Sequence, residues 1–300
     1  MATCPFGTSR SRRYIPWLSI SIPAAGWLIF GLYPSIATIF YSFTQYSGVP
    51  GTPLNVCGLC NYHNAFTKLL PDVGQSLKVT IIYVIGVTIG QNVVALLLAL
   101  LLKRRGRMFT FYRALIFMPQ IFSVAVVGAI FSLLLDPYSG PIEKVVHSVF
   151  GINSAFLGSS SAALPLVMAI NVWMFTGYSM LIYIAGLRQI PSEVYEAASL
   201  DGAGRFRAFR HVTWPLLASS TTVNVFLTAM GTLGEYALIL VLTNGNFGTR
   251  TLGMYMFTSA FGSATGQLGY GSMLAVLQFG LTLIIGGSLL YFLRRREVSL

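Results

Sequence analysis

Long apolar stretches alternate with short polar and glycine-rich segments along most of this chain. A helix needs about 20 apolar residues to cross the hydrocarbon core of a bilayer, which is about 30 Å thick. Six stretches reach that length, and they cover about residues 17–43, 80–102, 114–135, 163–187, 216–242 and 270–293. The pattern therefore predicts an all-α membrane protein with about six transmembrane helices.

The first stretch also has features of a secretory signal peptide. Three arginines precede it, and the small residues of segment 23–26 resemble a cleavage region. Its apolar run continues well past that point, which favours a retained spanning helix over a cleaved signal peptide.

The composition favours a membrane protein over a soluble one. Hydrophobic residues make up 55% of the 300 residues and charged residues only 9%, whereas a soluble domain carries roughly 25% charged residues. So few charged side chains do not cover the surface of so apolar a core. We expect a single transmembrane domain over residues 17–293, between a cytoplasmic segment 1–16 and a cytoplasmic tail 294–300.

The positive charge of the chain lies beside the apolar stretches. The net charge is +11, and fifteen of the nineteen Lys and Arg residues precede the first stretch, follow the sixth, or lie in the second-to-third and fourth-to-fifth connections. Cytoplasmic loops retain positive charge, so both termini are expected in the cytoplasm. This placement suits anionic lipid headgroups and does not form the stripe that binds nucleic acid.

Cysteine and histidine do not form a recognisable metal site. The chain has three cysteines, and two of them, Cys57 and Cys60, form a single Cys-x-x-Cys in an expected external loop. Structural zinc needs a second pair of ligands. A local disulfide and two ordinary loop cysteines are the alternatives, and no metal is expected.

The connection 188–215 is longer than a turn requires and contains helix signals of its own. Pro191 suits the start of a helix, Glu196 places an acid in its first half, and Gly202 suits its C-terminal cap. The small side chains of residues 197–198 would let another protein approach closely. Without a partner, the segment would be an interfacial pair of short helices.

Residues 196–203, Glu-Ala-Ala-Ser-Leu-Asp-Gly-Ala, followed by Phe209 and Trp214-Pro215-Leu216, resemble the EAA loop of binding-protein-dependent ABC importer permeases. Weaker similarities to the carbohydrate-uptake, maltose-type branch extend over most of the chain. They lie at residues 58–62, 136–140, 242–251 and 269–273. The chain departs from that branch where Asn246 and Phe247 replace the usual Gly-Pro, which leaves the external end of the fifth stretch open.

This resemblance implies a permease of the bacterial cytoplasmic (inner) membrane for a sugar or sugar-like solute. Its implied partners are a second homologous permease, two ATPase subunits and an extracytoplasmic solute-binding protein. ATP and Mg would bind to the ATPase subunits and no cofactor to this chain, which lacks a Gly-x-x-x-x-Gly-Lys-Ser/Thr phosphate loop. The residues implied to couple ATPase closure to the spans are Glu196, Ala197, Ala198, Asp201, Gly202 and Ala203.

Polar and aromatic groups within the expected spans are the candidates for a solute pathway, because each costs free energy in hydrocarbon unless it faces a cavity or another helix. Glu235 is the only acid well inside an expected span. Aromatic rings stack on sugar faces, and amides bind hydroxyls. The other candidates are Gln120, Asn171, Trp173, Tyr178, Asn224, Tyr236 and Gln278. For most of them the alternative is a bond between helices or a place in an interfacial belt. For Gln120, which follows Pro119, the alternative is a structural kink in the third stretch.

Two other functions make different demands on the sequence. A secondary transporter driven by an ion gradient would need paired acids and bases within the membrane, and Glu235 has no evident cationic partner there. A membrane enzyme would need convergent catalytic groups near one membrane face, and none is evident. The importer is therefore the favoured hypothesis, and ion-coupled transport is the alternative.

Overall fold

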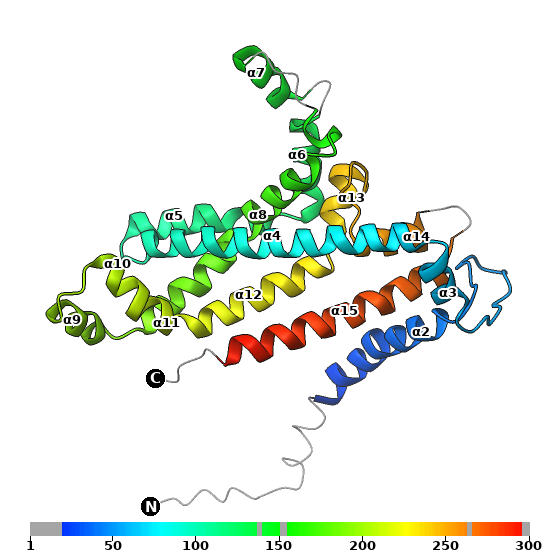
Figure 1. Ribbon diagram of the computed structural model, residues 1–300, viewed down its shortest axis with the longest axis horizontal. Coiled ribbons are helices and arrows are strands. Elements are labelled where there is room, and N and C mark those ends of the chain that lie inside the picture. Colours follow the sequence, from blue (N-terminus) through cyan, green and yellow to red (C-terminus); the bar gives the residue numbers. More distant parts are fainter. Residues whose placement is uncertain (1–19, 137–139, 151–154, 263–265, 296–300) are drawn as a thin grey trace, which may run out of the picture.

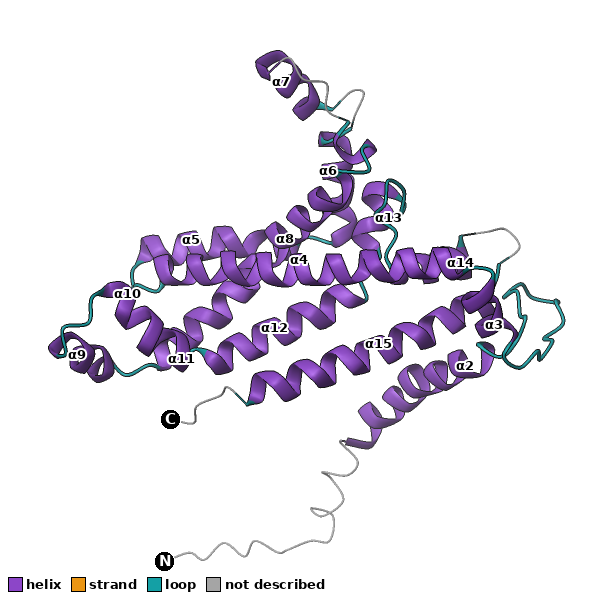
Figure 2. Ribbon diagram, in the orientation of Figure 1, coloured by secondary structure: helices purple, strands orange, loops and turns teal. Residues whose placement is uncertain are grey.

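A computed structural model describes residues 20–136, 140–150, 155–262 and 266–295 of the chain. Helices make up most of these residues (Figure 2). Within the described part, the β-type pairing is a single isolated bridge between Thr44 and Val56. The all-α fold class expected from the sequence is confirmed.

Four helices have the length and apolar character to cross a membrane. They are residues 20–41, which include η1 (Leu28–Leu32) and α2 (Tyr33–Tyr41), α4 (Leu70–Leu102), α8 (Ala163–Gln189) and α15 (Leu268–Arg294). Two bent helix pairs, 107–134 and 205–233, pass the same test and bring the candidate spans to six. The chain is thus a multi-pass membrane protein.

The stretches expected as single spans at 114–135 and 216–242 are both interrupted. In the first, α5 (Arg107–Phe117) is followed by the short segment η2 (Met118–Ile121), and α6 (Val124–Leu134) continues at 92°. Pro119 lies in η2 and cannot donate a backbone hydrogen bond, which is a common cause of such a break. The structure therefore has two helices and a short connecting segment here, where the sequence predicted one uninterrupted span.

In the second stretch, α12 (Ala218–Leu233) ends before Gly234 and α13 (Ala237–Thr243) begins after Tyr236. The connection that leads into α12 also contains helices. They are α9 (Ser192–Leu200), α10 (Arg205–Ala208), η4 (Phe209–Thr213) and α11 (Trp214–Leu216). A further helix, α14 (Leu252–Phe261), precedes α15 and was not expected from the sequence.

Most of the long helices run between two ends of the molecule, which Figure 1 places at left and right. We call them the α9 end and the α3 end, after α9 and the short helix α3 (Cys60–Thr67). A disulfide joins Cys57 to Cys60, so of the two alternatives for these cysteines the structure has the disulfide. The side-chain amide of Asn61 donates to the carbonyls of Ser42 (2.9 Å) and Thr44 (2.8 Å) and fixes the first loop to the end of α2.

Close contact between α4 and α8 forms the centre of the bundle. A Cβ added to Gly86 would lie 2.6 Å from the sulfur of Met168, so the absence of a side chain at Gly86 leaves room for the Met168 thioether between the helices. The Gln91 side chain donates to the Ser179 hydroxyl at 2.7 Å, which links the helices where both are buried.

The outer face of α4 carries large apolar side chains that nothing in the described chain covers. They follow one helical ridge at intervals of four residues, and each is more than half exposed: Ile85, Ile89, Val93, Leu97 and Leu101. Exposed apolar surface of this extent marks a membrane or protein interface. It fits a helix that faces lipid.

Candidate functional site

A cavity of about 290 Å³ lies among α4, η2, α8 and α12, within the membrane-spanning bundle. Its wall combines amides, hydroxyls, two aromatic rings and one carboxylate. The lining residues are Gln91, Gln120, Asn171, Phe175, Tyr178, Leu227, Thr228, Gly231, Thr232 and Glu235. Such a mixture can bind the hydroxyls of a small polar molecule and stack on its apolar faces.

Glu235 occupies the interruption between α12 and α13. Its Oε1 accepts a hydrogen bond of 2.9 Å from the backbone N–H of Leu238, in the first turn of α13. The positive end of a helix dipole favours a carboxylate at this position. The Thr251 hydroxyl donates to the backbone carbonyl of Glu235 at 3.1 Å. The break in the helix therefore holds the carboxylate at the cavity wall.

The cavity brings together four of the eight side chains that the sequence indicated for a solute pathway. These are Gln120, Asn171, Tyr178 and Glu235. Among the described residues, the carbonyl oxygens of the Gln120 and Asn171 side chains are buried without a hydrogen-bond partner. Buried polar groups are normally satisfied by protein, water or ligand. The two side-chain oxygens therefore have no protein partner at the cavity wall, whereas the Asn171 side chain also contacts the hydroxyl of Tyr83.

Asn224 and Gln278 lie outside the cavity lining and link helices. The Asn224 amide donates to the Ser179 carbonyl at 3.1 Å, which joins α12 to α8. The Gln278 amide donates to the Leu233 carbonyl at 3.1 Å, at the end of α12. Helix-to-helix bonding was the alternative stated for such amides.

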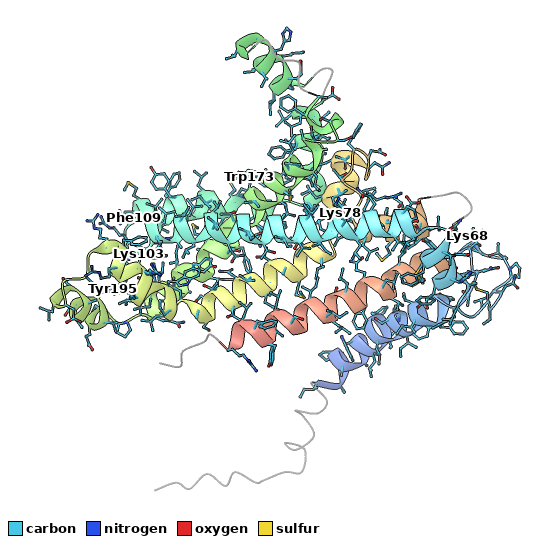
Figure 3. All side chains as sticks on the ribbon, viewed as in Figure 1. Lys68, Lys78, Lys103, Phe109, Trp173 and Tyr195 are labelled. Carbon is cyan, nitrogen blue, oxygen red and sulfur yellow. A yellow bond between two sulfur atoms is a disulfide. The ribbon has the colours of Figure 1, made fainter. Side chains whose placement is uncertain are left out.

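Trp173 and Tyr236 also lie outside the cavity lining. The Trp173 ring is 5.4 Å from the Phe131 ring, centroid to centroid, and borders an apolar groove beside η2. Figure 3 shows Trp173 where α8 and α6 meet. Tyr236 stacks on Phe257 with a centroid distance of 4.9 Å.

Sequence reasoning missed Gln91, Thr228 and Thr232 in the cavity wall. Gln91 offered a detectable signal, because it is an amide in the middle of the apolar stretch 80–102. The two threonines gave no such signal, because a threonine hydroxyl commonly donates a hydrogen bond to a backbone carbonyl of its own helix. Thr232 does so by donating to the Thr228 carbonyl at 2.8 Å.

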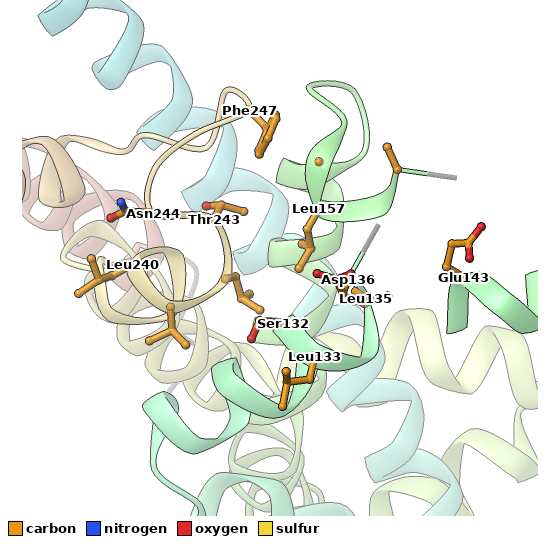
Figure 4. Close-up of a pocket in the computed structure, with 14 residues that line it drawn as sticks. Ser132, Leu133, Leu135, Asp136, Glu143, Leu157, Leu240, Thr243, Asn244 and Phe247 are labelled. Carbon is orange, nitrogen blue, oxygen red and sulfur yellow. The ribbon is translucent and has the colours of Figure 1, made fainter. Parts of the chain in front are cut away.

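A second hollow, of about 750 Å³, lies beside α6 and α13 (Figure 4). Asp136 and Glu143 contribute carboxylates to it, and Phe247 contributes an aromatic ring that is 45% exposed. The loop after α13 has positive φ at Asn244 (51°) and Phe247 (55°). This hollow adjoins the segment in which the sequence departs from the carbohydrate branch.

The helix α9 projects at one end of the molecule (Figure 1). Its last turn closes with two backbone bonds, from Gly202 N–H to the Ser199 carbonyl (3.1 Å) and from Ala203 N–H to the Ala198 carbonyl (2.9 Å). This pair is a Schellman cap, which requires left-handed backbone after the helix. Gly202 supplies it with φ of 74°.

The surface of α9 is open to a partner. Glu196, Ala197, Asp201 and Gly202 are exposed, whereas Ala198 and Ala203 are half-buried. Leu200 at the helix end is 90% exposed. These side chains are therefore accessible to another subunit.

Two contacts tie α9 to the rest of the α9 end. The hydroxyls of Tyr195 and Thr213 hydrogen-bond at 3.1 Å, which joins α9 to η4. The Lys103 ammonium lies 5.6 Å from the centre of the Tyr195 ring, and Figure 3 shows the two residues together at the end of α4. Force applied to α9 would therefore reach α4 and the helices that lead into α12.

Comparison with known proteins identifies the family. Residues 91–298 match the family described as binding-protein-dependent transport system inner membrane component. The diacetylchitobiose uptake system permease protein NgcF of Streptomyces coelicolor is 30% identical over 88% of this chain and 78% of its own. The multiple sugar-binding transport system permease protein MsmF of Streptococcus mutans is 27% identical over 91% and 92%.

A solved bacterial alginate ABC transporter, in complex with an alginate pentasaccharide-bound periplasmic protein, contains a chain with the same fold. Its TM-score is 0.79, with coverage of 95% of this chain and 96% of that one, at 18% identity. The matched family model spans the cavity, the connection with α9 and the last three long helical segments. The chain belongs to the inner membrane components of binding-protein-dependent transport systems.

Proposed function

We propose that this chain is the permease subunit that carries a sugar or sugar-like solute through an ATP-driven importer. The observation that carries the proposal is the cavity within the bundle, where amides, a carboxylate and aromatic rings line one space. One relative named above is described by sugar-binding transport and the other by diacetylchitobiose uptake. Those names support a carbohydrate as the transported solute, and experiment has to identify which one.

The solute reaches the cavity from an extracytoplasmic binding protein, at the α3 end. The distribution of Lys and Arg along the sequence supports this orientation, with both termini and the α9 end in the cytoplasm. A second permease subunit completes the pathway. ATP and Mg bind to two separate ATPase subunits, and this chain binds no cofactor.

The coupling surface consists of Glu196, Ala197, Ala198, Asp201, Gly202 and Ala203, on and just after α9. An ATPase that closes around ATP pulls on α9, and the contacts from Tyr195 to Thr213 and Lys103 pass the movement to α4 and η4. The pull shifts the pathway between two states only if α9 contacts the ATPase differently in each. The cavity then opens alternately to the two sides of the membrane.

The test is co-purification of the tagged chain with its ATPase subunits and partner permease from the same membranes. Wild type and Glu196→Ala are compared for bound ATPase and for uptake per ATP hydrolysed. The proposal expects wild type to retain the ATPase, and the variant either to lose it or to hydrolyse ATP without matching uptake. A wild-type chain that transports without any ATPase would contradict it.

Ion-coupled secondary transport makes a different demand on the cavity. It needs an acid whose charge is balanced by a moving ion or a nearby base. Among the described lining residues Glu235 has no Lys or Arg beside it, and the family match covers importer components. The importer is the function that these observations favour.

A further inference from the structure

The charge of the cavity wall has one sign. Glu235 is the only ionisable acid among the described lining residues, and no Lys, Arg or His is among them. Its Oε1 accepts a hydrogen bond of 2.9 Å from the backbone N–H of Leu238, and a bond of this kind stabilises the ionised form of a carboxyl group. The described lining from this chain therefore offers one carboxylate and no basic side chain to offset its charge.

The other polar groups of the wall do not fix the sign of the ligand's charge. Asn171 is only 2% exposed, and its side-chain oxygen has no partner among the described residues. The side-chain oxygen of Gln120 is likewise buried without a hydrogen-bond partner among the described residues. An amide can turn either its oxygen or its nitrogen toward a ligand. These groups suit hydroxyls, and the carboxylate alone discriminates by charge.

We propose that this cavity selects uncharged or positively charged sugars, such as amino sugars, and excludes sugars that carry a carboxylate, sulfonate or phosphate. The inference rests on the proposed function and adds a charge class to it. It separates the chain from the alginate importer whose fold it shares, since alginate is an acidic polysaccharide. At so low a sequence identity, the similarity to that transporter supports a shared fold and not a shared substrate.

Gly231 offers a way to measure the cavity's charge directly. It lies in α12 on the cavity wall, and a Cβ at this position would meet no atom within 4 Å. A Gly231→Cys thiol should therefore fit. The variant is made with Cys4→Ser, while Cys57 and Cys60 are held in their disulfide. Modification of this chain is followed by intact mass in the assembled importer, in lipid nanodiscs.

Two methanethiosulfonate reagents of similar size and opposite charge are the probes. One carries a trimethylammonium group and the other a sulfonate. In each case the thiolate displaces methanesulfinate and forms a mixed disulfide. Each rate is divided by the rate of the same reagent with 2-mercaptoethanol. We expect the cationic reagent to react roughly tenfold faster at Gly231→Cys, because a carboxylate in a partly desolvated site attracts a cation and repels an anion.

Glu235→Gln supplies the matched control, because it keeps the shape of the side chain and removes the charge. The ratio of the two rates should fall close to one in the double variant. Gly287→Cys, on the exposed side of α15 and also with no atom within 4 Å, should react with neither reagent if that face lies in hydrocarbon.

The outcomes separate this inference from the proposed function. Equal rates at Gly231→Cys, faster reaction of the sulfonate, or a cation preference that persists in Glu235→Gln would overturn the charge selection and leave the importer standing. If neither reagent reached Gly231→Cys, with or without ATP, the cavity would not be part of an aqueous pathway. That result would overturn both.

Discussion

Gly202 has a backbone conformation that other residues adopt only at a cost. Its φ is 74°, and a Cβ there would meet no atom within 4 Å, so the cost of a side chain is conformational and not steric crowding. A non-glycine residue in the left-handed region costs roughly 1–2 kcal/mol. The Schellman cap that closes α9 depends on this one position.

We predict that Gly202→Ala reduces ATP-driven uptake several-fold while the chain still inserts in the membrane in normal amounts. The strain loosens the end of α9, which the ATPase would grip. Gly204→Ala is the matched control, because Gly204 has φ of −66° and equally open space, and it should behave like wild type. Uptake normalised to membrane-inserted protein is the measurement. Equal losses in both variants would contradict a specific role for the cap.

Residue chemistry alone predicted part of the cavity. Glu235, Gln120 and Asn171 stood out because polar side chains are rare in apolar stretches, and all three line the cavity. Asn224 and Gln278 gave the same signal and bond to backbone carbonyls of other elements. Those carbonyls are 45 residues away in the sequence in both cases. Local pattern does not distinguish a lining amide from a bridging one.

The apolar pattern of the sequence predicts the long helices but not the breaks within them. Run length correctly indicated α4, α8 and α15, although α4 begins at Leu70 and not near residue 80. It did not indicate the 92° turn at η2 or the interruption at Glu235. Both breaks lie beside the cavity, and they depend on proline, glycine and tertiary hydrogen bonds, which hydropathy does not register.

Packing between α8 and α5 leads to a prediction about stability. A Cβ on Gly177 would lie 2.5 Å from the Ile116 carbonyl oxygen and 2.6 Å from the Phe117 Cα. Backbone atoms of a packed helix yield little, so we expect Gly177→Ala to destabilise the fold by roughly 1–3 kcal/mol. Thermal unfolding of the purified protein in nanodiscs measures the effect as a lower Tm.

Gly280→Ala is the control for that experiment. A Cβ at Gly280 in α15 would meet no atom within 4 Å, so the substitution should leave the Tm unchanged or raise it slightly, because alanine favours helix over glycine. If Gly177→Ala unfolded at the wild-type temperature, the close approach of α8 to α5 would be wrong.

The first helix leaves many large apolar side chains exposed on the molecule. The first helix has no buried residue in η1 or α2, and it contacts the bundle mainly through α15. A helix held so loosely by its own chain suits an assembly in which another subunit covers it. The orientation of this assembly in the membrane is open to a simple chemical test.

We predict that only one of the three cysteines reacts with an alkylating reagent in denatured, unreduced protein taken from cell membranes. Cys57 and Cys60 are joined in the first loop. In the proposed orientation, which the distribution of positive charge supports, this loop faces the oxidising external compartment. After reduction all three should react, and mass spectrometry counts the added groups. Three reactive cysteines without reduction would contradict both the disulfide and an external loop.

The most direct test of the account is solute uptake by the complete importer in proteoliposomes, with the binding protein outside and either ATP or an ion gradient as the energy source. Solutes from neutral, amino and acidic sugar classes are each supplied bound to the binding protein. For an ATP-driven importer we expect accumulation that requires ATP and the ATPase subunits, is unaffected by ionophores, and is lost in Glu196→Ala. Accumulation driven by an ion gradient without ATPase subunits would contradict it.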